Sequence, residues 1–139
     1  MSLFDAMAIA RSSLTAQTAK MNTVAQNLAN ADTVASSPEE TYTAQAPRFR
    51  AVLEGQIDPN NSSEMGVVVD GIVEVGGPAN QEFNPEHPLA DDDGYIYRPD
   101  INPATEMADL MQASRSFQNS IEAINTAKQL ALRTLTLGK

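Results

Sequence analysis

The chain has 139 residues, about the length of one domain, and a formal net charge of −9 at pH 7. This acidic balance argues against nucleic acid and anionic membrane surfaces as partners, because lysine and arginine bind the phosphates of both. The chain has no cysteine, which excludes disulfides, thiol catalysis and thiolate metal sites, and only 5% of its residues are aromatic, which leaves little material for a dense core.

Neither membrane insertion nor a cleaved secretory signal is expected. No run of about 18 apolar residues is present, so the sequence predicts no membrane-spanning helix. The first residues, MSLFDAMAIARSS, lack the basic start and the clear apolar run that signal peptides combine. If the protein leaves the cytoplasm, its export route must recognise a feature other than a cleaved signal peptide.

The charge divides the chain into three parts. Residues 1–33 carry no net charge and residues 103–139 carry +1, whereas residues 34–102 hold thirteen acidic residues against three arginines, a net −10. Seven of the eight prolines and six of the seven glycines also fall in the middle part. We therefore expect an N-terminal helix (1–33), an acidic β and loop insert (34–102) and a C-terminal helix (103–139).

The first segment has the apolar periodicity of a long amphipathic helix. No proline or glycine interrupts it, and Ser2 is placed to cap its start. The periodicity predicts a helix of nearly thirty residues with two coiled-coil-like rows. One row comprises Met7, Leu14, Met21 and Leu28, and the other comprises Leu3, Ala10, Gln17 and Val24.

The outer face of this first helix is unusual because it carries almost no charge. Only four of the first 32 residues are charged, and serine, threonine, asparagine and alanine fill the positions outside the rows. A solvated helix face normally carries charged side chains. We interpret the uncharged face as a surface for close contact with other chains. Asn27 and Asn30 would then lie at a helix end wedged between neighbours, where Asn30 can adopt the left-handed cap conformation.

The middle segment predicts turns and short strands. Residues 48–53 alternate between apolar and polar, and residues 66–75 are rich in β-branched side chains. Asp70-Gly71 inside the second run is a hairpin signal. Residues 59–63 (PNNSS) predict a loop, and Asp93-Gly94 predicts a turn that leads into a short strand at 95–97.

The last segment predicts a second long helix, with Asn102 as its N-cap and Pro103 as its first residue. The fold class is therefore α+β: two long terminal helices packed as an antiparallel coiled-coil-like pair, with a central β-rich insert. The apolar rows of this helix are Leu110, Phe117, Ile124 and Ala131, with the companion row Met107, Ser114, Ile121, Lys128 and Leu135.

Catalytic and metal-binding signatures are weak. The only histidine, His87, lies between Glu86 and Pro88 and is best explained as an exposed loop residue. The DDDG run at 91–94 does not fit a calcium loop, because tyrosines occupy ligand positions and the twelfth position is Asn102 rather than glutamate. We expect no catalytic residue, no cofactor, no metal and no enzyme activity.

Two interpretations of the terminal helices remain open at this point. The helices could pack only on one another in a small α+β domain, or they could also contact other chains. The uncharged face of the first helix favours the second interpretation, and its poor helix propensity predicts that both ends are largely unfolded in the free monomer. The expected assembly residues are Met7, Leu14, Met21, Asn27, Leu28, Asn30, Leu110, Phe117, Ile121, Ile124 and Leu135.

Both ends of the chain resemble the flagellar basal-body rod protein family. Residues 14–33 (LTAQTAKMNTVAQNLANADT) are similar to the N-terminal signature of the flagellar axial proteins, whose N-x-A-N-A-x-T run here spans 27–33. Residues 106–139 (EMADLMQASRSFQNSIEAINTAKQLALRTLTLGK) resemble the matching C-terminal helix, and 87–102 (HPLADDDGYIYRPDIN) narrows the resemblance to the proximal rod.

The resemblance implies a structural subunit of the rod in the periplasm. It also implies that subunits leave through the flagellar type III export apparatus without a cleaved signal, and that copies and other rod subunits are the partners. In this family the terminal helices form the inner part of a tubular assembly that transmits torque. A soluble coiled-coil adaptor of another class is the main alternative, and an acidic binding module that uses the insert is a weaker one.

Overall fold

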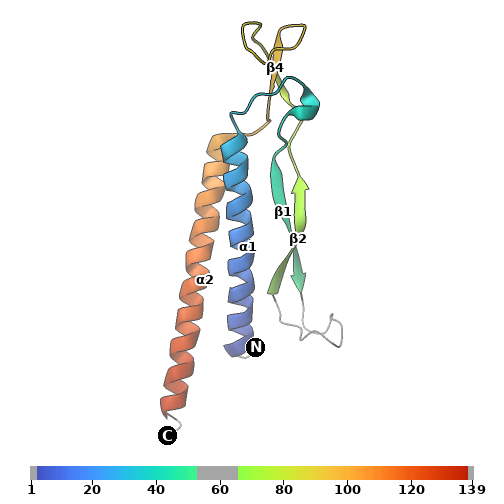
Figure 1. Cartoon of the computed structure of the whole chain (residues 1–139). Coiled ribbons are helices and arrows are strands. Elements are labelled where there is room, and N and C mark those ends of the chain that lie inside the picture. Colours follow the sequence, from blue (N-terminus) through green and yellow to red (C-terminus); the bar gives the residue numbers. More distant parts are fainter. Residues whose placement is uncertain (1–2, 53–65, 138–139) are drawn as a thin grey trace.

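The computed structural model describes residues 3–52 and 66–137 of the chain. Two long antiparallel helices lie side by side, a two-stranded hairpin runs along the first helix, and a second small hairpin lies beyond one end of the helix pair (Figure 1). This arrangement confirms the α+β prediction. In chain order the elements are α1 (Leu3–Asn30), the 3-10 turn η1 (Pro38–Glu40), β1 (Gln45–Val52), β2 (Gly66–Glu74), β3 (Asn80–Phe83), β4 (Tyr95–Arg98) and α2 (Pro103–Leu137).

The helix pair packs through small residues. The predicted α2 row from Leu110 through Phe117 to Ile124 is half-buried; Ala113 lies between the first two members, Ala127 follows the last, and both alanines are buried. With Ser120, which is bonded to α1, the spacing is alternately three and four residues, which is the seam of a coiled coil. Alanine and serine in the seam allow the helix axes to approach closely, but they bury little apolar area.

The sequence predicts an N-cap residue at the start of each long helix, and the structure describes the one that precedes α2. The side-chain oxygen of Asn102 accepts hydrogen bonds from the backbone N–H groups of Ala104 (3.0 Å) and Thr105 (3.3 Å), so Asn102 is the N-cap and Pro103 opens α2 as predicted. Ser2 and the loop at 59–63 lie outside the described residues.

At the C-terminal end of α1, Asn30 does not adopt the left-handed cap conformation. No non-glycine residue in the described part of the chain has a positive φ. The helix closes instead with backbone hydrogen bonds from Ala31 to Leu28 and from Thr33 to Asn30. The Thr33 hydroxyl also donates to the Asn30 carbonyl at 2.7 Å, which satisfies a carbonyl group at the helix end without a left-handed residue.

The hairpin of β1 and β2 is antiparallel and is attached to α1 near both of its ends. At one end, the Ser12 hydroxyl accepts a hydrogen bond from the Val67 N–H at 3.1 Å. The neighbouring Gly66 lies so close that a Cβ atom there would clash with the Ser12 side chain. At the other end, Asn27 contacts Gln45 at the start of β1.

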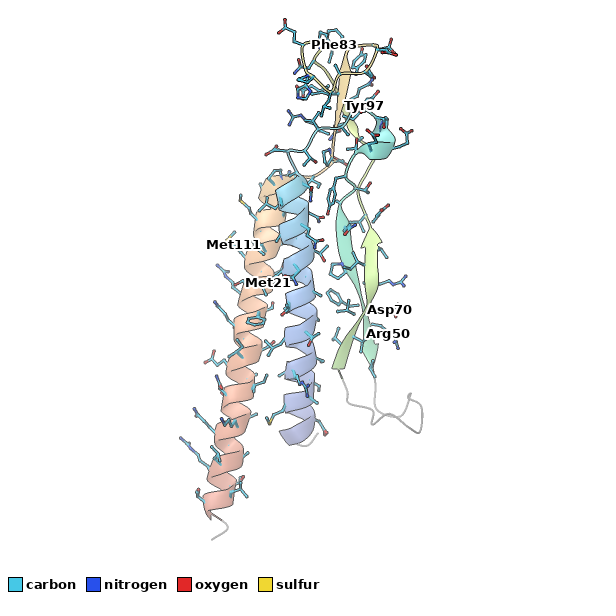
Figure 2. The ribbon with its side chains drawn as sticks, viewed as in Figure 1. Met21, Arg50, Asp70, Phe83, Tyr97 and Met111 are labelled. Atoms are coloured by element: carbon cyan, nitrogen blue, oxygen red, sulfur yellow. The ribbon has the colours of Figure 1, made fainter. Side chains whose placement is uncertain are left out.

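The prediction of a turn at Asp70-Gly71 was wrong. Arg48 is paired with Gly71 and Phe49 with Val69, so Asp70 is an extra residue in the middle of β2. The dipeptide forms a β-bulge, another place where glycine is favoured because a positive φ is needed; Gly71 has φ +154°. The bulge brings the Asp70 carboxylate to 3.1 Å from the Arg48 guanidinium and 3.6 Å from that of Arg50 (Figure 2).

The second hairpin pairs β3 with β4 and closes through the predicted turn at Asp93-Gly94. Gly94 has φ +83°, which favours glycine, and its N–H donates to the Asp91 carbonyl at 3.0 Å. Ile96 of β4 is fully buried, and an isolated bridge between Ala35 and Tyr97 ties this hairpin to the segment after α1. Strand β3 was not predicted, because its residues NQEF are all exposed and show no apolar alternation.

Candidate assembly interface

One buried side chain joins the parts of the molecule. The Asn27 carbonyl oxygen accepts hydrogen bonds from the Tyr42 hydroxyl and the Gln45 N–H, both at 2.9 Å. Its amide nitrogen donates to the Gln45 carbonyl at 2.8 Å and to a Glu106 carboxylate oxygen at 3.3 Å. Asn27 is 2% exposed, so a single amide of α1 links the loop before β1, the first residue of β1 and the first turn of α2.

The electrostatics of this junction follow from its burial. The pKa of Tyr42 is raised above its ordinary value, chiefly because the phenol is partly removed from water and also because the Glu106 charge disfavours a second negative charge nearby. The phenol therefore remains a donor to Asn27 over the whole neutral range. Glu106 reaches Asn27 because the Asn102 cap fixes the first turn of α2.

The expected assembly residues fall into three groups. The first group is half-buried and lies on α1 and α2: Met7, Leu14, Met21, Leu28, Leu110, Phe117 and Ile124. The second is exposed on α2, where Ile121 is 39% and Leu135 is 71% exposed. The third is the amide pair: Asn27 is bonded within its own chain, and Asn30 donates to the Gln26 carbonyl of its own helix at 2.8 Å.

For Asn27, the interpretation of a helix end that bonds sideways to neighbouring chains is therefore replaced by an intrachain role. All of its hydrogen-bonding capacity is used by residues of the same subunit. Within the subunit, Asn27 holds the start of the hairpin against the helix pair.

Hydroxyl groups add polar contacts that the apolar periodicity of the sequence does not indicate. The Ser13 and Ser120 hydroxyls are hydrogen-bonded across the helix pair at 3.0 Å, and Thr23 is buried with its hydroxyl bonded to the Ala19 carbonyl. Lys20 and Asp109 form an ion pair at 3.5 Å on the partly exposed edge of the pair, where it contributes little. Ser13 and Ser120 carry no apolar signal, so only their position in the seam could have indicated them.

The surface of the helix pair is suited to further packing. Large apolar side chains stand exposed along α2, among them Met111, which points away from α1 (Figure 2). On α1 the exposed hydroxyls of Thr15 and Thr18 are already bonded to carbonyls four residues earlier. Polar groups that are satisfied within their own helix can be covered by another chain without losing a hydrogen bond.

The segment at 91–97 has a distinct electrostatic structure. One Asp91 carboxylate oxygen accepts the N–H groups of Tyr95 (2.8 Å) and Asp93 (3.0 Å), and the other accepts the Tyr97 hydroxyl at 3.0 Å. The Tyr95 backbone bond is the main reason that the pKa of Asp91 is lowered, and the bond to Asp91 is the main reason that the pKa of Tyr97 is raised.

The other acidic side chains of this turn do not converge on a metal site. No group of three or more histidine, aspartate or glutamate side chains in the described part of the chain is arranged to hold a metal ion. His87 accepts a hydrogen bond at Nδ1 from the Leu89 N–H at 3.1 Å, which is a local loop contact.

Replacing Asn27 should detach the hairpin from the helix pair. Asn27→Ala leaves the Tyr42 hydroxyl, the Gln45 backbone and Glu106 without their buried partner, and it should lower local stability by about 2–4 kcal/mol. Hydrogen exchange of residues 45–52, measured by mass spectrometry on purified assemblies, should speed up accordingly. Asn22→Ala, at an exposed position of the same helix, is the matched control; equal exchange in the two variants would contradict the role of Asn27.

The Asp91 turn should respond to pH in two ranges. The lowered pKa of Asp91 means that its contribution is present above the ordinary carboxyl pKa of about 4 and is lost in stronger acid. The raised pKa of Tyr97 means that its contribution is complete below about pH 10 and is lost as Tyr97 ionises. NMR titration of labelled tyrosine should show the Tyr97 pKa falling in Asp91→Asn but not in Asp92→Asn; the same value in all three proteins would refute this coupling.

Comparisons with known proteins agree with this architecture. The family described as "Flagella basal body rod protein" matches residues 7–34, and "Flagellar basal body rod FlgEFG protein C-terminal" matches residues 92–137. The flagellar basal-body rod proteins FlgC of Salmonella typhimurium and Yersinia enterocolitica are each 38% identical to this chain, and that of Bacillus subtilis is 29% identical; all three alignments cover the whole of both proteins. The chain belongs to the FlgC family of flagellar basal-body rod proteins and is a structural subunit of the basal-body rod.

Proposed function

We propose that this subunit assembles through its terminal helices, with copies of itself and with other rod subunits, into the periplasmic part of the axial shaft that transmits motor torque. The observation that carries the proposal is the row of large apolar side chains left exposed on α2, including Met107, Met111, Ile121 and Leu135. Several large apolar side chains exposed along one helix indicate a surface that meets another protein. Neither α1 nor α2, as described here, combines the length and the apolar character that a membrane span needs.

Stiffness follows from the same features. Long helices that lie side by side and pack through alanine and serine bring their backbones close together, and a close-packed interior deforms little. An interface that joins different patches on successive copies grows as a helix rather than closing as a dimer. The three-part division at 1–33, 34–102 and 103–139 then has a mechanical meaning: the two helices form the shaft and the insert decorates it.

Export in an unfolded state fits the composition of the first helix. Serine, threonine and asparagine lower its intrinsic helicity, and the seam of the helix pair is made largely of small residues. We propose that the subunit passes through the flagellar type III apparatus with its N-terminus intact and that the helices form on assembly. No catalytic function is part of this proposal, and the relatives' names support a structural role rather than the adaptor alternative.

Deletion of the gene should abolish motility, and complementation should return the chain to purified basal bodies. Mass spectrometry of those basal bodies should detect an N-terminal peptide that begins within the first two residues, since no signal is removed. A chain found only in the soluble fraction would support the adaptor alternative, and a start tens of residues later would contradict export without cleavage. A His87→Ala variant should remain motile.

The dilute monomer should be weakly helical. The helices α1 and α2 contain 28 and 35 residues, together 63 of the 139 residues of the chain. A subunit with both helices formed would therefore show strong helical circular dichroism. We expect well under half of that signal at micromolar concentration, because packing rather than propensity stabilises such helices. Helical signal that rises with protein concentration would support folding on assembly, whereas a full signal at every dilution would contradict it.

A further inference from the structure

The second half of α2 has different surfaces on its two flanks. One flank carries a row of exposed long side chains, which we name the ridge: Ile121, Lys128, Leu132 and Leu135. Their spacings of seven, four and three residues keep them within one stripe of the helix surface. Three of the four are large apolar residues, and the fourth, Lys128, is the only charge in the row.

The other flank carries a groove between the start of α1 and the second half of α2. Two adjoining hollows of about 560 and 410 Å³ share Ala6, Asn119 and Ala123 among their lining residues. Most of the lining side chains are small, so the surface is recessed where the ridge protrudes. We name as the groove Ala6, Ala10, Asn119, Ala123, Thr126 and Leu130; Glu122 is the only charged residue at it.

One subunit cannot place its ridge in its own groove. Ile121 and Ala123 are two positions apart, which is about 200° around the helix, and Leu132 and Thr126 are separated by about 240°. The ridge and the groove therefore face different sides of the helix pair. A ridge that occupies the groove must therefore belong to another molecule.

The ridge and the groove carry charged residues of opposite sign. Glu122 at the groove and Lys128 on the ridge form no ion pair within the described residues. If Lys128 of one copy meets Glu122 of a second copy with the same direction, the copies are offset by six residues, about 9 Å along the helix. The same offset brings Leu132, which is 53% exposed, level with Thr126 of the groove.

We infer that the groove of each subunit holds the ridge of a second copy of the same chain, aligned by a Lys128–Glu122 ion pair between the two. This inference rests on the proposed function and specifies which surface of the helix pair meets which. The contact is heterologous, because a ridge meets a groove and not another ridge. It therefore leaves one ridge and one groove free at the two ends of any open row, so further copies can be added.

The absence of cysteine from the chain allows a direct test. A Leu132→Cys/Thr126→Cys double variant, incorporated into basal bodies and treated with a short bismaleimide, should give a ladder of dimers and larger oligomers. Each single-cysteine variant should stay monomeric, because its partner position lacks a thiol. Dimers from a single variant would indicate a symmetric contact and overturn the inference. No ladder from an incorporated double variant would also overturn it while leaving the rod function intact, since the protein would still be in the basal body.

Charge reversal gives an independent measurement that does not depend on the cysteines. Glu122→Lys or Lys128→Glu should each reduce the amount of the chain in basal bodies by about fivefold, because attraction becomes repulsion at every contact. The double reversal should restore it to at least half of the wild-type amount, and Gln129→Lys, outside both surfaces, should leave it unchanged. A double reversal as defective as the single variants would assign the groove to a different rod subunit and overturn the inference. If the wild-type chain were itself absent from basal bodies, the proposed function would be refuted instead.

Discussion

The structure depends on a buried primary amide. Asn27 must both donate and accept, because it faces a backbone carbonyl, a backbone N–H, a phenol and a carboxylate at once. Aspartate lacks the donor and glutamine is one methylene longer, so neither could reproduce this set of bonds without moving β1. The position of the hairpin relative to the helices thus follows from a single side chain near the end of α1. That side chain can act only when α1, β1 and α2 are all in place.

This dependence matters because the apolar core is small. The buried apolar residues of the helices are mainly alanine. In the described part of the chain, the largest fully buried side chains are Ile96 and Thr23. At about 25 cal/mol per Å² of apolar area, alanine contributes far less than leucine would in the same seam. Several of the larger apolar side chains of α2, among them Met111, Leu132 and Leu135, are instead exposed, where they stabilise the subunit little. In the proposed function, these side chains meet other chains.

Much of the fold could be predicted from the sequence, because the helices have a strong period and clear caps. The seven-residue rows identified both helices, and Asn102-Pro103 located the start of α2. The Asp70-Gly71 prediction failed because hairpin turns and β-bulges both favour glycine at a position with positive φ. Only the pairing of the strands distinguishes the two. The junction at Asn27 could not be predicted, since it joins residues 18 and 79 positions away in the chain. The sequence marked Asn27 as unusual for a helix, but it could not show whether the partners lie within the subunit or outside it.

The separation of charge along the chain restricts how copies of such a subunit can approach one another. The insert at 34–102 carries a net −10, whereas the two terminal segments together carry +1. Inserts of neighbouring copies repel one another over roughly a Debye length, about 8 Å at physiological salt, while near-neutral helices can approach to contact. Only arrangements that bring helices together and hold the inserts apart escape this repulsion. An array with the helices toward an axis and the inserts pointing away from it meets both conditions, and a tube is the simplest such array.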